Sequence, residues 1–274
     1  MIGWFEAVVL GLVQGLTEFL PISSNAHVRI VSALFGWEDP GAAFTAVMQL
    51  GTETAVLVFF RRDIAHIVTQ WSRSLVRPEV RADPAARLGW FVILGTIPIG
   101  VLGLLLKDEI ETAFRDLRVI ALALLLFSFV LGYADAVARN RLPLERLTVR
   151  HAVVFGLAQS LALVPGVSRS GGTISAGLLL GYTREAATRY SFLLAIPAVL
   201  ASGLFELREI GAGESVDWGP TLLATVIAFV VGYAVIRWLI RYVATHTFRP
   251  FVIERVIVAV LILGLLFGGV IEPS

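Results

Sequence analysis

GLVQGLTEFLPISSNAH, residues 11–27, and GLAQSLALVPGVSRSGG, residues 156–172, are two versions of one pattern. The matching pairs are Gly11 with Gly156, Gln14 with Gln159, Leu16 with Leu161 and, after a one-residue gap, Pro21 with Pro165 and Ser24 with Ser168. Each copy is an apolar stretch that stops at a proline and opens into a turn rich in hydroxyl groups. In membrane proteins, paired broken hydrophobic segments in the two halves of a chain mark a binding site.

The composition of the whole chain is that of a membrane protein. Hydrophobic residues make up 57% of the 274 residues and charged residues 16%, against about 25% charged residues in a soluble domain. Mean hydropathy is +0.83. The net charge of +1 and the lack of a basic stripe argue against nucleic-acid binding, and the absence of cysteine excludes disulfides and thiol chemistry.

Six segments are long and apolar enough to span a bilayer, which takes about 20 residues each. They are roughly 41–60, 88–106, 118–138, 186–207, 219–241 and 251–271. Four shorter segments, 5–20, 26–36, 151–164 and 173–181, cannot cross alone. We therefore expect an all-α integral membrane protein with six transmembrane helices and two re-entrant helical hairpins.

The hairpins are expected to bend at the two prolines, Pro21 and Pro165, because proline lacks a backbone donor and clashes with the preceding helical turn. Ser24 or Asn25, and Ser170 or Thr173, are good N-caps for the second helix of each pair. The division of the chain that follows is a first repeat over 1–150, with its hairpin in 1–36, and a second repeat over 151–274, with its hairpin in 151–181. Together they would form one compact membrane domain.

Arginine-rich connections predict the orientation, because cytoplasmic loops carry an excess of basic residues. Arginines gather in 61–87, 139–150, 184–189 and 237–249, whereas the other connections carry Glu38, Asp39, Asp108, Glu109, Glu111, Asp116, Glu209, Glu214 and Asp217. If both hairpins return to their starting side, the basic loops are cytoplasmic and both termini lie outside. Each half then has one hairpin and three spans, so the second half is inverted relative to the first.

The first break brings together groups that can do chemistry. Gln14 and Glu18 share a helix face, and a carboxylate on that face is too costly to leave in lipid. Ser23, Ser24, Asn25 and His27 follow directly. His27 is a candidate base, acid or nucleophile, and Ser24 is either a helix cap or a nucleophile. The structural alternative is that Gln14 and Glu18 form a buried polar pair that holds the hairpin in place.

The second break has the composition of a phosphate site. It combines Ser168, Arg169, Ser170, Gly171 and Thr173 at the start of a half-helix. A helix N-terminus attracts anions, and the planar arginine fork matches phosphate oxygens. The structural alternative is that Arg169 of the second repeat neutralises Glu18 of the first.

A polyphosphate and Glu18 would repel each other, so a protonated Glu18 or a divalent cation is expected between them. Mg²⁺ and Ca²⁺ prefer carboxylate and phosphate oxygens. Because we see one carboxylate near the break, Glu18, we expect the metal to arrive with the substrate rather than to occupy a preformed protein cage.

At this point the chain resembles the undecaprenyl-pyrophosphate phosphatases, also called bacitracin-resistance proteins. Their first motif, Glu or Gln, three residues, Glu, then Phe-Leu-Pro and a serine pair, is present at residues 14–24, with His27 in place. Their second motif, Pro-Gly-x-Ser-Arg-Ser-Gly, is residues 165–171. Gln14 takes the non-acidic option, Asn25-Ala26 replaces the commoner Thr-Gly, and Glu53 stands where a neutral residue is expected.

The resemblance implies a multi-pass enzyme of the bacterial cytoplasmic (inner) membrane that depends on a divalent cation. It would convert undecaprenyl diphosphate into undecaprenyl phosphate and so recycle the lipid carrier of cell-wall precursors, with its site facing outside. Glu18, Ser24, His27 and Arg169 would be catalytic, with Glu18 also on the metal. The expected substrate-binding residues are Gln14, Ser23, Asn25, Ser168, Ser170, Gly171 and Thr173.

Two other functions are compatible with parts of this pattern. Inverted repeats with broken helices are the usual architecture of secondary carriers, so a polyprenyl-phosphate transporter or flippase using the same site is the main alternative. A structural scaffold is disfavoured by an arginine, a glutamate and a histidine inside the membrane. The sequence leaves open the attacking group, the preferred tail length and the oligomeric state, a homodimer included.

Overall fold

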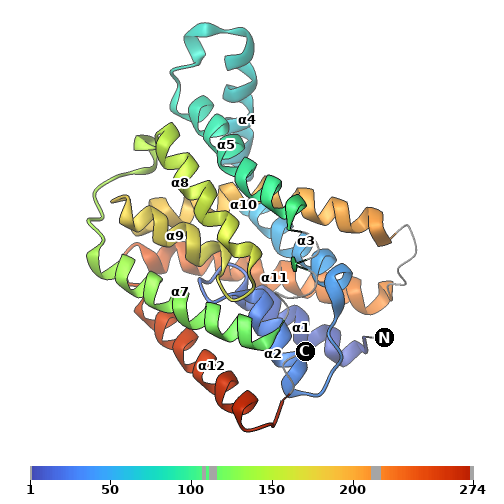
Figure 1. Cartoon of the computed structure of the whole chain (residues 1–274). Helices are drawn as coiled ribbons and strands as arrows, with labels where there is room; N and C mark the ends of the chain where they lie inside the picture. Colours follow the sequence, from blue (N-terminus) through green and yellow to red (C-terminus); the bar gives the residue numbers. More distant parts are fainter. Residues whose placement is uncertain (1, 107–108, 111–115, 211–216, 272–274) are drawn as a thin grey trace.

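The computed structural model describes residues 2–106, 109–110, 116–210 and 217–271, and these residues fold into helices (Figure 1). The α-helices are α1 (Trp4–Thr17), α2 (Ser24–Leu34), α3 (Gly41–Phe59), α4 (Arg61–Val76), α5 (Pro84–Leu105), α7 (Leu117–Val137), α8 (Val149–Ser160), α9 (Arg169–Leu179), α10 (Arg184–Ile210), α11 (Trp218–Val243) and α12 (Arg249–Phe267). Short 3₁₀ turns cover Pro78–Val80, Leu144–Arg146 and Leu161–Leu163. The acidic residues Asp108, Glu111 and Glu214 lie outside the described residues.

The predicted all-helical membrane protein is confirmed. Five of the six predicted spans are helices long and apolar enough to cross a membrane, namely α5, α7, α10 (over Arg184–Phe205), α11 and α12. The remaining span, α3, meets that criterion only together with α4, and the pair is bent by 77°. The stretch of α3 in that pair, Ala43–Phe59, is shorter than each of the other five spans.

The arginine-rich segment 61–87, which we expected to be a loop, is largely helical. It forms α4 and the turn Pro78–Val80, and α5 already begins at Pro84. Asp83 caps α5, accepting a hydrogen bond from the Ala85 backbone N–H at 2.8 Å. Because α4 is amphipathic and rich in arginine, its composition resembles that of a loop although its spacing suits a helix. With the start of α5 it projects beyond the other helices in Figure 1.

Both predicted hairpins exist, but their helices end and begin at other residues than expected. α1 ends at Thr17, before Pro21, and α8 ends at Ser160 and passes through a 3₁₀ turn before Pro165. The N-caps are Ser23 and Ser168, not the four residues predicted.

The cap residues also correct the match between the two repeats. Ser23 and Ser168 both have a positive φ, 74° and 71°, and each precedes a helix of 11 residues. Ser23 is therefore the counterpart of Ser168, and Ser24 is the counterpart of Arg169. The serines therefore align with the same spacing as Gly11 and Gly156, without a gap. The two prolines, Pro21 and Pro165, are shifted by one residue relative to that alignment.

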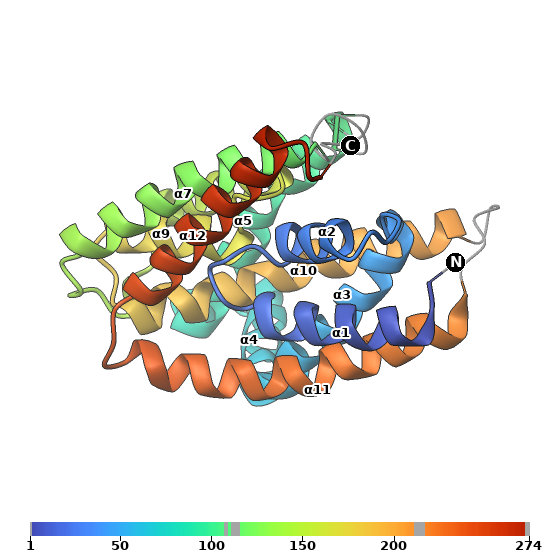
Figure 2. The ribbon, with the colours of Figure 1, turned by 90° about the horizontal axis from the view of Figure 1, so that it is seen from below.

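The two halves exchange partners in the packing. α1 lies along α11 (Figure 2), and α8 lies along α5. The matched glycines make both contacts close: a Cβ on Gly11 would lie 2.7 Å from the Ala224 carbonyl oxygen, and one on Gly156 would lie 2.5 Å from that of Gly95. Each hairpin therefore packs against a helix of the other half. This exchange is what a two-fold relation between the halves requires; the inverted topology stays a prediction.

Candidate active site

The two hairpin breaks touch each other at the centre of the molecule, as the repeat predicts. The backbone N–H of Gly166 donates to Ser23 Oγ at 3.2 Å, and Ser170 Oγ donates to the Leu20 carbonyl at 3.1 Å. Phe19 packs edge-on against Phe192 in the largest core cluster, which fixes the first break from the other side. Side chains from sequence-distant turns are thus held within hydrogen-bond reach.

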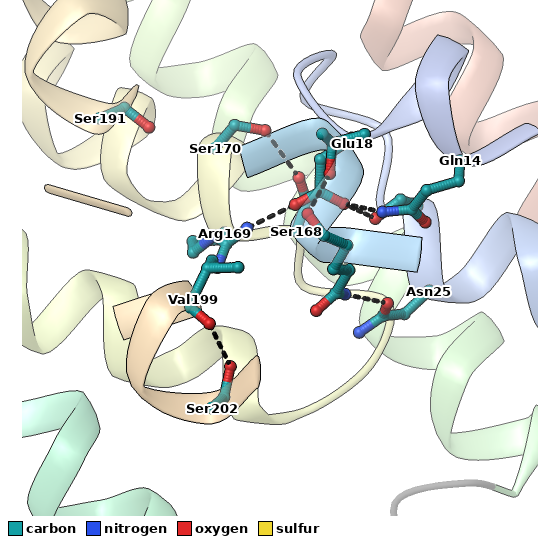
Figure 3. Close-up of polar contacts among 12 residues, drawn as sticks. Gln14, Glu18, Asn25, Ser168, Arg169, Ser170, Ser191, Val199 and Ser202 are labelled. Carbon is teal, nitrogen blue, oxygen red and sulfur yellow. Dashed lines mark hydrogen bonds and ion pairs between the residues drawn. The ribbon is translucent and has the colours of Figure 1, made fainter. Parts of the chain in front are cut away.

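Glu18 lies where the two breaks meet, and its side chain is 6% exposed. One carboxylate oxygen, Oε1, forms an ion pair with Arg169. The other, Oε2, accepts a hydrogen bond from Gln14 Nε2 at 2.8 Å (Figure 3). The ion pair between Glu18 and Arg169 shows that the two motifs are in contact, as predicted. It is also the neutralising pair that we considered as the structural alternative.

The Ser24 hydroxyl donates to the same carboxylate, with 2.5 Å between its Oγ and Glu18 Oε2. Ser24 is the first residue of α2 and is not the cap, which is Ser23. Its hydroxyl is therefore paired with a carboxylate instead of being used for capping. A hydroxyl that donates to a buried carboxylate is the arrangement of a nucleophile and its base.

A buried arginine of α12, Arg255, ties both breaks to the rest of the protein. Its side chain is 0% exposed. The guanidinium donates to the Ser128 hydroxyl and to four backbone carbonyls, which belong to Pro21, Leu124, Gly166 and Val167. Arg255 is not among the site residues predicted from the sequence. The available signal was an arginine inside a predicted span, which is rare and faces the protein interior.

A cavity of about 470 Å³ opens at the breaks. Its polar wall consists of Glu18, Ser23, Ser24, Asn25, Gln49, Ser168 and Arg169. Its other walls are mostly apolar and come mainly from α5 and α10, with Ile99, Gly103, Leu104, Ala198, Ala201 and Phe205. The N-termini of α2 and α9 both end at the polar wall, so two helix dipoles favour an anion there.

The other predicted binding residues are placed around this wall. Asn25 Oδ1 accepts from Gln49 Nε2 at 2.9 Å, so α3 is joined to the first break. Gly171 N–H donates to Ser168 Oγ at 3.1 Å in the α9 cap. Thr173 is buried and shares a hydrogen bond of 2.6 Å with Ser191 Oγ. Gly171 and Thr173 therefore support the break and do not line the cavity.

His27 is not brought to Glu18 or Ser24. Its Nδ1 donates to the Ser23 carbonyl at 2.9 Å, and its Nε2 lies 2.7 Å from Glu254 Oε1 on α12. It is absent from the cavity lining. In this geometry both ring nitrogens already have partners, so His27 connects α2 to α12 and cannot take the Ser24 proton directly.

A second cavity of about 470 Å³ lies at the other end of α5, near α4 and the start of α10. Its arginines are already occupied: Arg189 is 2.7 Å from Asp63, and Arg87 lies over the ring of Phe91. It contains none of the predicted site residues. The chemistry indicated by the two motifs therefore belongs to the cavity at the breaks.

Fold and site together define a multi-pass membrane protein with a cavity that has a polar wall beside an apolar groove. The chain belongs to the family described as bacitracin resistance protein BacA, whose model matches residues 7–261. Similar curated proteins include undecaprenyl-diphosphatase 2 of Frankia casuarinae, 62% identical over 99% of this chain and 97% of the relative. Undecaprenyl-diphosphatase of Kineococcus radiotolerans is 59% identical over 97% of this chain and 95% of the relative.

Proposed function

We propose that this protein is an undecaprenyl-diphosphatase, which hydrolyses undecaprenyl diphosphate to undecaprenyl phosphate and inorganic phosphate. The observation that carries the proposal is the constellation of Ser24, Glu18 and Arg169 at the junction of a polar wall and an apolar groove. The diphosphate would meet the polar wall, and the prenyl tail would lie between α5 and α10. The names of the relatives favour hydrolysis over transport as the function.

In the reaction that this geometry supports, Ser24 Oγ attacks the terminal phosphorus of the diphosphate. Its proton passes to Glu18 Oε2, the acceptor to which it already donates. The bond to the bridging oxygen breaks, and undecaprenyl phosphate leaves with the electron pair. Glu18 gives this proton to the departing undecaprenyl phosphate and is ionised again. Water then attacks the phosphoserine while Glu18 takes a proton from the water. Glu18 returns that proton to Ser24 Oγ as the bond to phosphorus breaks, which regenerates the Ser24 hydroxyl and releases phosphate.

The charge of the diphosphate falls on groups that the breaks already position. Arg169 begins α9 and lines the cavity, and the first N–H groups of α2 and α9 face the same region. Phosphoryl transfer depends mostly on positioning and electrostatic stabilisation. We therefore assign Arg169 to the phosphate oxygens once substrate displaces it from Glu18.

Dependence on a divalent cation stays a prediction, and the residues present fit such an ion. Glu18 is crowded, because Oε1 pairs with Arg169 and Oε2 accepts two hydrogen bonds. Among the residues that the structure describes, Oε1 of Glu53 is buried and has no hydrogen-bond partner. Carboxylate oxygens are the ligands that Mg²⁺ and Ca²⁺ prefer. A bound cation would supply charge neutralisation for the diphosphate.

The cellular setting is part of the same proposal. We place the protein in the bacterial cytoplasmic membrane, with the arginine-rich connections inside and both termini and the cavity outside. There it would recycle the carrier lipid for cell-wall synthesis and confer bacitracin resistance. A homodimer also stays a prediction.

Phosphate release from undecaprenyl diphosphate by the purified protein, with and without a chelator, tests the proposal. Ser24→Ala should lower the rate by about a hundredfold or more, because it removes the attacking oxygen. Ser202→Ala is the matched control: Ser202 lines the same cavity, and among the described residues its hydroxyl donates only to the Val199 carbonyl (Figure 3). Absence of phosphate release from the parent protein would refute the activity, and a parent-like rate in Ser24→Ala would assign the attack to water.

A further inference from the structure

Glu53 is a buried carboxylate that the reaction above does not use. It lies on α3, it is 3% exposed, and its Oε1 has no hydrogen-bond partner in the described part of the chain. Burying an unpaired carboxylate is costly. A ligand from outside the protein would offset this cost.

Glu53 lines a small cavity directly beside the site. The polar lining consists of Glu18, Glu53, Arg169, Ser170 and Ser191, and the volume is about 10 Å³, roughly what one water-sized ligand needs. Glu18 and Arg169 line both this cavity and the large one. The small cavity therefore lies directly against the large one, with Glu18 and Arg169 between them.

The charge and size of this cavity select its ligand. Two carboxylates face one guanidinium, which makes the lining anionic when all three groups are ionised, so an anion is repelled. The available ligand atoms are carboxylate and hydroxyl oxygens, which suit hard cations. We propose that Glu53 and Glu18 together bind one divalent cation here.

This site would also change the state of Arg169. Oε1 of Glu18 is now paired with Arg169, and a cation between Glu18 and Glu53 would replace the guanidinium as the counter-ion. Arg169 would then be free to bind phosphate in the large cavity. The inference rests on the proposed function for this consequence, whereas binding of the cation itself needs no substrate.

The test uses Mn²⁺ alone as the probe, on the purified full chain in detergent, without lipid substrate. Electron paramagnetic resonance should show one Mn²⁺ site in the parent protein that Mg²⁺ displaces. Glu53→Gln should weaken Mn²⁺ binding at least tenfold. The matched control is Glu185→Gln, the same substitution at an exposed glutamate of the second large cavity, and it should bind Mn²⁺ as the parent does.

Thermal unfolding provides a second readout that separates a ligand role from a packing role. Without metal, Glu53→Gln should be at least as stable as the parent, because it removes an unpaired buried charge. With Mn²⁺ the parent should gain stability through binding linkage, and Glu53→Gln should not. Parent-like Mn²⁺ affinity in Glu53→Gln, or no Mn²⁺ site in the parent, would overturn the inference.

Phosphate release measured on the same preparations keeps the two proposals apart. If the parent protein hydrolyses prenyl diphosphate and Glu53→Gln binds Mn²⁺ as the parent does, the cation site is refuted and the proposed activity stands. If the parent protein binds Mn²⁺ through Glu53 but releases no phosphate, the proposed activity is refuted and the cation site is supported.

Discussion

Arg169 makes its ion pair through a planar guanidinium, and this shape decides what a conservative substitution would do. Lysine keeps the charge but loses the two-pronged donor that matches phosphate oxygens. Arg169→Lys should lower turnover about tenfold or more, which corresponds to about 1.4 kcal/mol of barrier. Steady-state phosphate release measures the effect. Arg189→Lys, whose partner Asp63 lies in the second large cavity, is the control; equal losses in both variants would make Arg169 a structural residue.

Glu18 is predicted to matter through its charge more than through its shape. Glu18→Gln keeps the size and can still contact Gln14 and Ser24, but it cannot accept a proton from Ser24. Turnover should fall about a hundredfold or more, while the detergent-extracted protein unfolds at a temperature close to that of the parent. Phosphate release across a Mg²⁺ titration checks this, and a parent-like rate at all metal levels would leave Glu18 as a packing residue.

Some residues of the site could be predicted from the sequence and others could not. Glu18 and Arg169 were predictable, because a repeat that crosses at its breaks brings the two motifs together. The role of Ser24 could not be settled, because a shift of the start of α2 by one residue decides which serine caps the helix. The cap is Ser23, so the Ser24 hydroxyl is available to Glu18. The sequence also does not show that the imidazole of His27 reaches Glu254 on α12, because this contact joins segments far apart in the chain.

At the scale of elements, one side chain of α12 holds the breaks of both hairpins. Arg255→Met keeps much of the length but leaves several buried carbonyls without donors, each of which costs about 1–3 kcal/mol. We expect stability to fall by about 2–5 kcal/mol in total, with phosphate release falling in the fraction that stays folded. Thermal unfolding in detergent measures the first quantity.

Arg249→Met, at an exposed position of the same helix, provides the comparison for Arg255→Met. It should change the unfolding temperature little. Similar unfolding temperatures for the two variants would mean that the carbonyls at the breaks find water instead, and that Arg255 does not anchor them.

Elements were predictable where composition is unambiguous. Five spans follow from long apolar runs, and the two hairpins follow from short ones that stop near prolines. α4 was missed because its arginines suggest a cytoplasmic loop, although they sit on the exposed side of an amphipathic helix. The helix ends were shifted because the turn at Ser23 and the turn at Ser168 depend on a positive φ, which is uncommon for serine and therefore hard to read from the sequence.

At the scale of the whole molecule, the cavity joins a polar wall made by both hairpins to a groove between α5 and α10. Gly103 lies in that groove. Among the described residues, a Cβ there would meet only Leu163 Cδ2, at 3.7 Å. Gly103→Leu should therefore fold normally and occupy the space for the tail. It should raise KM for undecaprenyl diphosphate about tenfold, or about 1.4 kcal/mol, and raise it less for a short-tailed diphosphate.

The ratio of the KM values for the long-tailed and the short-tailed diphosphate tests whether the prenyl tail lies in the groove between α5 and α10. Gly264→Leu, at an open position of α12, should leave the ratio at the parent value. An unchanged ratio in Gly103→Leu would show that the tail leaves the site by another route.

The anchor formed by Arg255 also has a consequence for the order of biogenesis. The first break is synthesised within the first 27 residues and the second within the first 172, yet the guanidinium that holds both belongs to residue 255. Neither turn can be locked while the ribosome is still making the spans between them. We therefore expect the two turns to reach their final arrangement only when α12 has been made.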